Sequence, residues 1–253
     1  MFNELKGRTA IVTGSGQNIG RGIALALAKA GVNVMVNGLR DRKKIDNVAA
    51  EARAFGVQAH AMLADAADPD AIAGVVAETV KRFGAVDVAV SNIGIRPHQS
   101  IMEISVEDWR HVINVDMNAA FYLAKAVIPH MRERKWGRMI CLPGSEWLIV
   151  WPNRAHVNAA KAGLNALVKS IALEHGCDGI TANCICPGWI DTVRDLRNYP
   201  NFEDRIQHAK ETLPLRRIGT IDDIANTCMY LVSDMGRFVT GQSINVNGGE
   251  VMI

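Results

Sequence analysis

Residues 8–20 read RTAIVTGSGQNIG, in which an apolar run leads directly into a turn with glycine at positions 14, 16 and 20. The apolar run predicts a buried strand, and the residues after the turn have the period of a helix. In a strand–turn–helix unit, the backbone N–H groups of a glycine-rich turn and the N-terminus of the helix can face a pyrophosphate. Many tight turns contain glycine, so this interpretation depends on support from the rest of the chain.

The rest of the chain repeats this alternation of short apolar runs and longer segments of helical period. The predicted strands are residues 8–13, 32–37, 57–63, 86–91, 138–142, 180–186 and 243–246. The predicted helices are residues 19–30, 42–54, 68–83, 106–134, 157–176 and 221–233. Strands that are apolar on both faces and separated by helices indicate a parallel sheet covered on both sides. We therefore predict an α/β fold, with one doubly wound, Rossmann-type domain over residues 1–253 and a seven-stranded parallel sheet.

Local signals add two details to this plan. Asp68 precedes Pro69, and Ser105 stands three residues before Asp108, so Asp68 and Ser105 are predicted to begin helices.

The segment 189–215 is polar and irregular. Because an excursion of that length between a strand and a helix is often a substrate lid, we predict a lid there.

Composition restricts the function. Lys and Arg number 28 and Asp and Glu 26, a net charge of +2, which argues against nucleic acid or an anionic membrane as the main partner. No apolar run approaches the ~20 residues of a spanning helix, and the first residues make no secretory signal. Five cysteines, an odd number in apolar contexts, are typical of a reduced, cytoplasmic protein. Cys184 and Cys186 stand in an apolar predicted strand, where buried thiols are the simpler interpretation, so no metal site is expected.

Two predicted helices carry more apolar residues than one core-facing stripe requires. They are residues 106–134 and 157–176, with Phe121 and Leu173 among the surplus side chains. Such a surplus predicts that the protein associates with itself through these helices, as a homotetramer or a homodimer.

Further residues suited to a nucleotide stand at the ends of predicted strands. Asp65 follows the third strand, where a carboxylate can accept a hydrogen bond from an adenine amino group. Ser91-Asn92-Ile93-Gly94 ends the fourth strand, where a small turn can lie against a cofactor. Since the carboxyl ends of parallel strands share one edge of the sheet, these elements and the Gly14–Gly20 turn together predict a dinucleotide site.

These motifs resemble those of the short-chain dehydrogenase/reductase family, and the resemblance covers nearly the whole chain. Thr13–Gly20 is similar to the family's TGxxxGxG turn, with Asn18 in place of the middle glycine. Asparagine tolerates left-handed backbone, so we expect the turn to survive. The other matching elements are Ser91–Gly94, Asn114-Val115, Pro187-Gly188 with Thr192, Thr240–Gln242 and Gly248-Gly249. Within the family, residues 37–41 and 185–189 look most like those of 3-hydroxybutyrate dehydrogenases.

The resemblance implies an oxidoreductase that uses NADP(H) or NAD(H). The cofactor-binding residues that it implies are Gly14, Gly16, Gln17, Asn18, Ile19, Gly20, Arg40, Asp65, Asn92, Gly94, Lys161, Pro187, Gly188, Ile190 and Thr192. An acidic residue after the second strand would bind the ribose 2′-OH of NAD, but Gly38 stands there. Four basic residues follow, and they can either neutralise a 2′-phosphate or form a solvated helix start: Arg40, Arg42, Lys43 and Lys44. We favour NADP(H), with NAD(H) as the alternative.

The family's proton donor is missing from this sequence. Hydride transfer to a carbonyl needs a proton donor beside the developing alkoxide, and the family supplies it with Tyr-x-x-x-Lys. The matching segment, residues 157–161, keeps Lys161 but has Val157 in the tyrosine position. The family's serine falls thirteen residues earlier, on Gly144. Asn114 and Lys161 remain, a pattern that preserves cofactor binding and alters the chemistry.

Three residues are candidates for the missing role. The pKa of a histidine such as His156 suits acid–base catalysis near neutrality. However, His156 stands one residue before Val157, so its side chain is turned about 100° around the helix from the tyrosine position. Ser145 can reach the substrate if the loop absorbs one residue. For Glu146, a surface position is the simpler interpretation. The candidate catalytic residues are therefore Asn114, Ser145, Lys161 and His156.

Arg96, Arg154 and Trp189 are candidate substrate residues. Two guanidinium groups near one pocket suit a carboxylate or a phosphate, although surface or subunit contacts explain them equally well. Three functions stay open. The first is an NAD(P)-dependent oxidoreductase for a small hydroxy or keto compound, which is anionic if the arginines bind it. The second is a non-redox enzyme on the same scaffold, and the third is a silent nucleotide-binding subunit or sensor. Lys161 and Asn114 favour the first.

Overall fold

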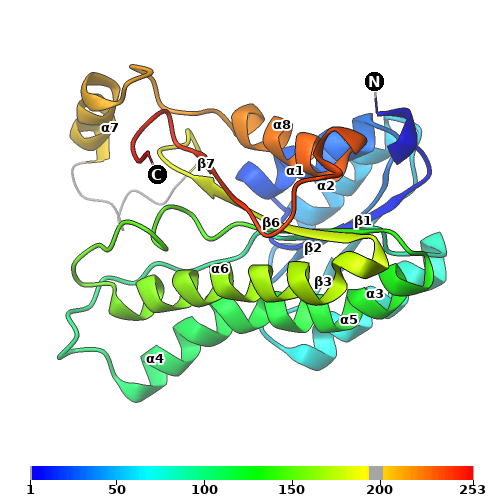
Figure 1. The fold of residues 1–253 in the computed structure, drawn as a ribbon, viewed down its shortest axis with the longest axis horizontal. Helices are drawn as coiled ribbons and strands as arrows, with labels where there is room; N and C mark the ends of the chain where they lie inside the picture. The colour runs from blue at the N-terminus through cyan, green and yellow to red at the C-terminus, as the bar shows by residue number, and fades with distance from the viewer. Residues whose placement is uncertain (1, 194–201, 253) are drawn as a thin grey trace.

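In a computed structural model, which describes residues 2–193 and 202–252, one seven-stranded parallel sheet forms the centre of the molecule (Figure 1). Its strands are β1 (Thr9–Val12), β2 (Asn33–Gly38), β3 (Ala59–Leu63), β4 (Val88–Ser91), β5 (Gly137–Cys141), β6 (Ile180–Pro187) and β7 (Ser243–Val246). The spatial order is β3-β2-β1-β4-β5-β6-β7. The order reverses between β1 and β4, and ligands of such sheets bind in the crevice at this switch point.

Helices cover both faces of the sheet. They are α1 (Asn18–Lys29), α2 (Arg42–Arg53), α3 (Pro69–Phe83), α4 (Val106–Ile113), α5 (Ala119–Glu133), α6 (Ala155–His175), α7 (Phe202–Thr212) and α8 (Ile221–Val232). Helices α1, α2 and α8 pack on one face, and α3, α5 and α6 on the other, so the core has two apolar layers (Figure 1). The predicted doubly wound fold is confirmed, with each strand within two residues of its predicted bounds.

Two predicted helix starts are confirmed by their caps. The Asp68 carboxylate accepts hydrogen bonds from the backbone N–H groups of Asp70 and Ala71. The Ser105 hydroxyl accepts one from the backbone N–H of Asp108. Each cap satisfies a donor that the first turn of a helix leaves without an intrahelical partner.

Two predictions about helices are wrong. The predicted helix 106–134 is interrupted by a π-helical turn at Asn114–Asn118, which separates α4 from α5. The predicted irregular segment 189–215 contains α7, whose sequence buries only Ala209 and therefore has no clear apolar stripe. Residues 194–201 of that segment lie outside the described residues. Among the described helices, none is long and apolar enough to cross a membrane.

Candidate active site

The glycine-rich turn is held against the end of β4. Gly14 has a φ of +60°, and a Cβ atom there would lie 2.5 Å from the Asn92 carbonyl oxygen. The Asn92 side chain donates to the Gly14 carbonyl oxygen at 3.0 Å, and its backbone N–H donates to the Thr13 hydroxyl at 3.1 Å. A Cβ at Gly20 would also meet the Gly14 carbonyl oxygen. The turn and the Asn92 element therefore form one rigid unit.

The start of α1 offers backbone donors to an anion. Gln17, the residue before the helix, makes no side-chain cap, so the first N–H groups of α1 have no partner within the helix. Asn18 takes a φ of +51°, which confirms that asparagine supports the left-handed turn. Its side-chain amide donates to the Val193 carbonyl oxygen at 2.9 Å and accepts from the Val193 N–H at 3.0 Å. The uncapped helix start and the glycine turn fit a pyrophosphate.

The last residue of β2, Gly38, is packed against a side chain of α2. A Cβ at Gly38 would lie 2.7 Å from the Ile45 side chain. Lys44 Nζ donates to the side-chain oxygen of Gln17 at 2.8 Å, so one basic residue reaches the turn. The other basic residues are exposed, and Arg42 is paired with Asp46 at 2.8 Å.

A cavity of about 460 Å³ opens beside this turn. The predicted cofactor residues that line it are Gln17, Asn18, Ile19, Asn92, Gly94, Lys161, Pro187, Gly188, Ile190 and Thr192. Ser145 and all three predicted substrate residues, Arg96, Arg154 and Trp189, line it as well. Seven predicted site residues that the structure describes are not part of its wall: Gly14, Gly16, Gly20, Arg40, Asp65, Asn114 and His156. The Asp65 carboxylate instead accepts from the Ala67 N–H at 2.9 Å.

Lys161 is the buried cation of the cavity. It projects from α6, is 1% exposed, and its Nζ lies 3.0 Å from Asp116 Oδ2. The other Asp116 oxygen accepts from the Ile95 N–H at 2.7 Å. A Cβ at Gly94 would lie 2.8 Å from Lys161 Nζ, so glycine is needed there. Burial lowers the pKa of Lys161, and the Asp116 carboxylate opposes this shift.

The Asn114 side chain makes its hydrogen bonds to residues other than Lys161. Its amide donates to the Ala67 carbonyl oxygen at 2.9 Å, and its oxygen accepts from the Tyr122 hydroxyl at 3.0 Å. Asp116, which lies in the same π-helical turn, pairs with the lysine. π-Helical turns are frequent at functional sites. The signal in the sequence was a carboxylate between two apolar residues, Val115 and Met117.

Glu146 is buried in the cavity, so its predicted surface position is wrong. Its residue exposure is 7%, and its Oε1 accepts from Arg96 Nε at 2.8 Å and lies 3.5 Å from Arg154 Nη1. Its Oε2 fills the space that a side chain at Gly144 would need. Burial raises the pKa of Glu146, but Arg96 and the backbone outweigh burial, and the net shift is downward. Glu146 is therefore a carboxylate that holds two arginines.

Arg154 joins this group to a histidine. Its Nε donates to His98 Nε2 at 3.2 Å, so that ring nitrogen is the unprotonated one. Burial lowers the pKa of His98, and the nearby Arg154 and Arg205 lower it further. His98 is therefore a neutral support for the Arg154 guanidinium.

Comparison with known proteins identifies the family. The model of the enoyl-(acyl carrier protein) reductase family matches residues 14–250. The chain is 38% identical over 245 residues to a 3-oxoacyl-(acyl-carrier-protein) reductase of Staphylococcus epidermidis, covering 97% of this chain and 99% of that protein. It is 32% identical over 254 residues to a D-beta-hydroxybutyrate dehydrogenase of Rhizobium meliloti, covering 96% and 98%. The chain belongs to the short-chain dehydrogenase/reductase family.

A solved structure agrees with this assignment. A crystal structure described as a short-chain alcohol dehydrogenase of Sinorhizobium meliloti superimposes with a TM-score of 0.91 at 29% identity, covering 96% of each chain. The short-chain dehydrogenase/reductase fold therefore extends over nearly the whole chain. The protein is an oxidoreductase of this type.

His156 and Ser145, two candidates for the proton donor, lie in different places relative to the cavity. His156 is fully buried and its Nε2 contacts the Gln99 side chain at 3.1 Å, outside the cavity wall. The structure therefore does not bring His156 to the other site residues. Ser145 lines the cavity, and its carbonyl oxygen accepts from two later N–H groups. Val157 is fully buried in α6.

Sequence reasoning missed one carboxylate of the cavity. Glu250, near the C-terminus, lines the same space, and its Oε1 accepts from Trp189 Nε1 at 3.0 Å. The Arg205 guanidinium lies 5.2 Å from the centre of the Trp189 ring. Glu250 follows the glycine pair at 248 and 249, and no periodic pattern marks where this terminal segment folds.

Proposed function

We propose that the protein is an NAD(P)(H)-dependent oxidoreductase that interconverts a hydroxyl and a carbonyl group on a small anionic compound. The observation that carries the proposal is the continuity of one cavity from the uncapped start of α1 to Lys161 and the two arginines. A bound nicotinamide would supply or accept the hydride. Lys161 would hold the nicotinamide end, as the family resemblance implies. The relative named for D-beta-hydroxybutyrate supports a small hydroxy acid.

The charge of the cavity supports an anionic substrate. Arg96 and Arg154 both line the cavity, and the Glu146 carboxylate contacts both of them. Arg154 is only 8% exposed, so its charge is poorly solvated. A guanidinium group can donate two N–H bonds to one carboxylate, which suits an anionic substrate.

The cofactor preference that we propose is NADP(H). Gly38 brings no carboxylate for a ribose 2′-OH, and packing against Ile45 leaves no room for one. Lys44 lies at the turn, and Arg40 is exposed nearby in sequence. These charges suit a 2′-phosphate, which NAD(H) lacks.

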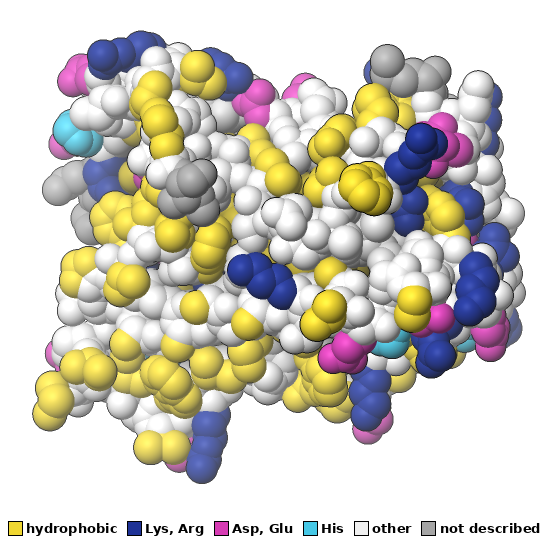
Figure 2. Space-filling view, in the orientation of Figure 1, with side chains coloured by type: hydrophobic (Ala, Val, Ile, Leu, Met, Phe, Trp, Pro, Cys, Tyr) yellow, Lys and Arg dark blue, Asp and Glu magenta, His cyan; other side chains and the backbone are white. Residues whose placement is uncertain are grey.

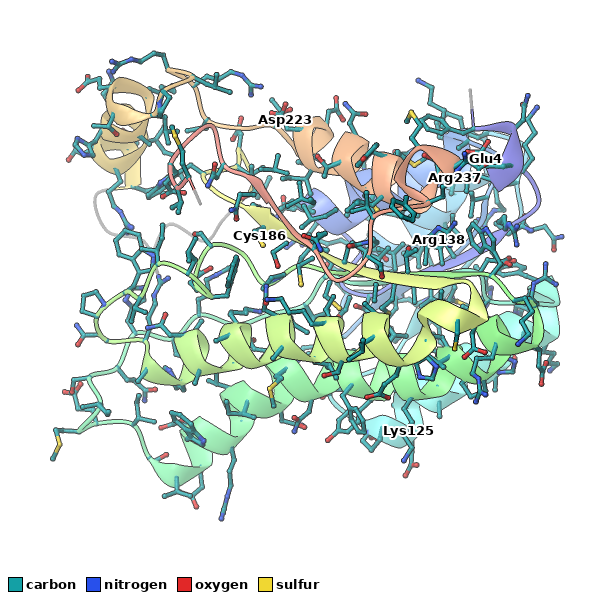
Figure 3. The ribbon with its side chains drawn as sticks, viewed as in Figure 1. Glu4, Lys125, Arg138, Cys186, Asp223 and Arg237 are labelled. Carbon is teal, nitrogen blue, oxygen red and sulfur yellow. The ribbon has the colours of Figure 1, made fainter. Side chains whose placement is uncertain are left out.

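An absorbance assay tests this function. Purified protein with NADPH and a panel of short keto acids should show loss of the reduced nicotinamide absorbance, with uncharged methyl ketones reduced more slowly. Arg154→Gln should raise the KM for keto acids by about 10- to 100-fold, because a hydrogen bond to a charged group contributes ~1.5–3 kcal/mol. Arg237→Gln is the matched control, since Arg237 is exposed and lies at the far end of the molecule from α7 (Figure 3). Equal rates for keto acids and ketones would contradict the anionic substrate.

The valine in the tyrosine position favours a second function. Val157 cannot donate a proton, and Glu146 and Glu250 both line the cavity. An enzyme that catalyses elimination, addition or hydrolysis would use such carboxylates without any hydride transfer. A silent nucleotide-binding subunit would need neither the carboxylates nor a hydride. Cofactor binding without any absorbance change across the panel would favour these alternatives.

We propose that the protein forms a homotetramer or homodimer through α4, α5 and α6. Val106, Trp109, Phe121 and Leu173 are exposed large apolar residues on these helices. Figure 2 shows hydrophobic side chains gathered over the lower part of the molecule, where these helices lie. Sedimentation equilibrium at micromolar concentration should show a dimer or tetramer. Phe121→Glu with Leu173→Glu should shift it toward the monomer, and a monomeric wild type would contradict the assignment.

We also propose that the described parts of the segment predicted as a lid at 189–215, residues 189–193 and 202–215, cover the cavity. Trp189 and Arg205, which lie on its two described parts, both line the cavity.

We propose that the protein works in the cytoplasm. All five cysteines are free thiols, which supports a reducing compartment.

A further inference from the structure

His98 lies on the segment after β4, and its neighbours hold that segment beside the start of α6. The Gln99 N–H donates to the Asn153 carbonyl oxygen at 2.9 Å, which joins this segment to the residue before Arg154. The Gln99 side chain also donates to Asp108 Oδ2, on α4, at 3.1 Å. The segment that carries His98 is therefore anchored both to α4 and to the start of α6.

The Arg154 guanidinium is contacted at all three of its nitrogens. Its Nε and Nη2 both contact His98 Nε2, the first at 3.2 Å. Its Nη1 lies 3.5 Å from Glu146 Oε1. Because a guanidinium is planar, contacts on two sides fix both its place and the orientation of its plane. Arg154 lines the cavity and is 8% exposed, so these contacts decide how the group is presented there.

His98 can hold this guanidinium only while its ring is neutral. An arginine has donors alone, so Nε2 must accept, and an imidazolium has no nitrogen that accepts. Protonation would also bring two positive charges into contact. Partial burial lowers the pKa of His98, and the charges of Arg154 and Arg205 lower it further. His98 remains exposed to solvent, so a proton can reach it from water.

The other charged groups nearby contact neighbours of this imidazole. Arg96 and Arg154 both pair with Glu146. Asp108 and His156 meet the side chain of the next residue along the chain. In the described part of the chain no carboxylate contacts the imidazole, so none offsets its repulsion by Arg154 once it is protonated.

We propose that His98 is a positioning residue for the substrate anion, which holds Arg154 in place while its ring is neutral and releases it when the ring is protonated. The inference rests on the proposed function, in which Arg154 binds the anionic group. Among the described residues His98 is not part of the cavity wall, so it acts through Arg154. Substrate affinity should then fall in acid although the charge of the substrate does not change.

The KM for a short keto acid, measured with saturating NADPH from about pH 8 to about pH 5, tests this role. The KM of the wild type should rise about 10-fold as pH falls through the lowered pKa of His98, with a smaller change in kcat. The keto acid stays ionised, since a carboxyl group has a pKa of roughly 3.5. Attraction by the new positive charge alone would lower the KM, so the direction of the change separates positioning from simple attraction.

Two variants of His98 separate its acceptor from its titration. His98→Gln supplies an oxygen acceptor that does not titrate, so its KM should stay near the wild-type value at high pH throughout. His98→Leu supplies no acceptor, so its KM should be raised about 10-fold at every pH. His60→Leu is the matched control. His60 lies on the edge strand β3, outside the cavity wall, and its pKa is also lowered by burial, so this variant should keep the wild-type profile.

Proton NMR gives a readout that needs no turnover. The His98 resonance, assigned by its absence in His98→Gln, should titrate below the ordinary histidine pKa in the wild type. In Arg154→Gln this pKa should rise, because one of the two positive charges that face the ring is removed.

The outcomes distinguish this inference from the proposed function. A wild-type KM that is flat or falls in acid, or a His98 pKa that is the same in Arg154→Gln, would overturn the role of His98 and leave the proposed function in place. Wild-type protein that binds NADPH but reduces no compound in the panel would overturn the proposed function, and the role of His98 in substrate binding with it. A KM that rises in acid, and that loses this rise in His98→Gln, is the expected result.

Discussion

Gly14→Val is expected to abolish saturable binding of both NADPH and NADH. The new Cβ would lie 2.5 Å from the Asn92 carbonyl oxygen and 3.0 Å from the Ile93 side chain. A β-branched residue is also strained at a φ of +60°. Both effects displace the turn from β4 and block a close backbone approach to a pyrophosphate. Titration of nicotinamide fluorescence measures the loss.

Gly84→Val is the matched control for this variant. Gly84 has a φ of +81° and a Cβ there would meet nothing within 4 Å. The control therefore shares the backbone strain but not the steric contact, and it should lose some stability while it binds cofactor normally. If Gly14→Val binds NADPH as the wild type does, the phosphate site is elsewhere.

Asp116→Ala is expected to destabilise the protein by about 3–5 kcal/mol, because it leaves the buried Lys161 ammonium without its partner. For a chain of this size, that corresponds to a fall in Tm of about 6–20 °C. Burial already lowers the pKa of Lys161, and loss of Asp116 lowers it further. The folded variant then binds its proton more weakly than the unfolded chain does. The loss of stability should therefore be largest at low pH. It should shrink as pH rises from the pKa of Lys161 in the folded variant to its pKa in the unfolded chain.

Thermal unfolding at several pH values measures this effect. Asp46→Ala removes the exposed pair with Arg42 and should leave Tm close to that of the wild type. Asp116→Ala combined with Lys161→Met should recover much of the lost stability, because no charge is then buried alone. An Asp116→Ala protein as stable as the wild type would show that Lys161 is not held by this pair.

The strands and the glycine-rich turn could be predicted from sequence because each depends on local signals. Apolar runs define the strands, and the glycines of the turn are required by close backbone approaches such as that of Gly14 to Asn92. Helix α7 could not be predicted in the same way, since it buries a single residue and has no apolar stripe.

The rearranged part of the site could not be predicted because it depends on tertiary contacts. Asp116, in the π-helical turn, pairs with Lys161, and the apolar pattern of the sequence does not mark this turn. Glu146 is buried only because Gly144 leaves a space and Arg96 supplies a charge. Burial of a carboxylate is unfavourable without such partners. A glutamate considered without them is therefore predicted to lie on the surface.

Asn18 has a consequence for how the phosphate turn and the segment after β6 move. Glycine would adopt the same left-handed φ, but only the asparagine amide makes the two hydrogen bonds to Val193. The residue that shapes the phosphate turn is therefore also an anchor for the chain that leaves β6 toward α7. A dinucleotide that settles on the turn would also immobilise this anchor. Asn18→Gly would keep the left-handed turn but release Val193 from it, so the turn and the segment after β6 would no longer move together.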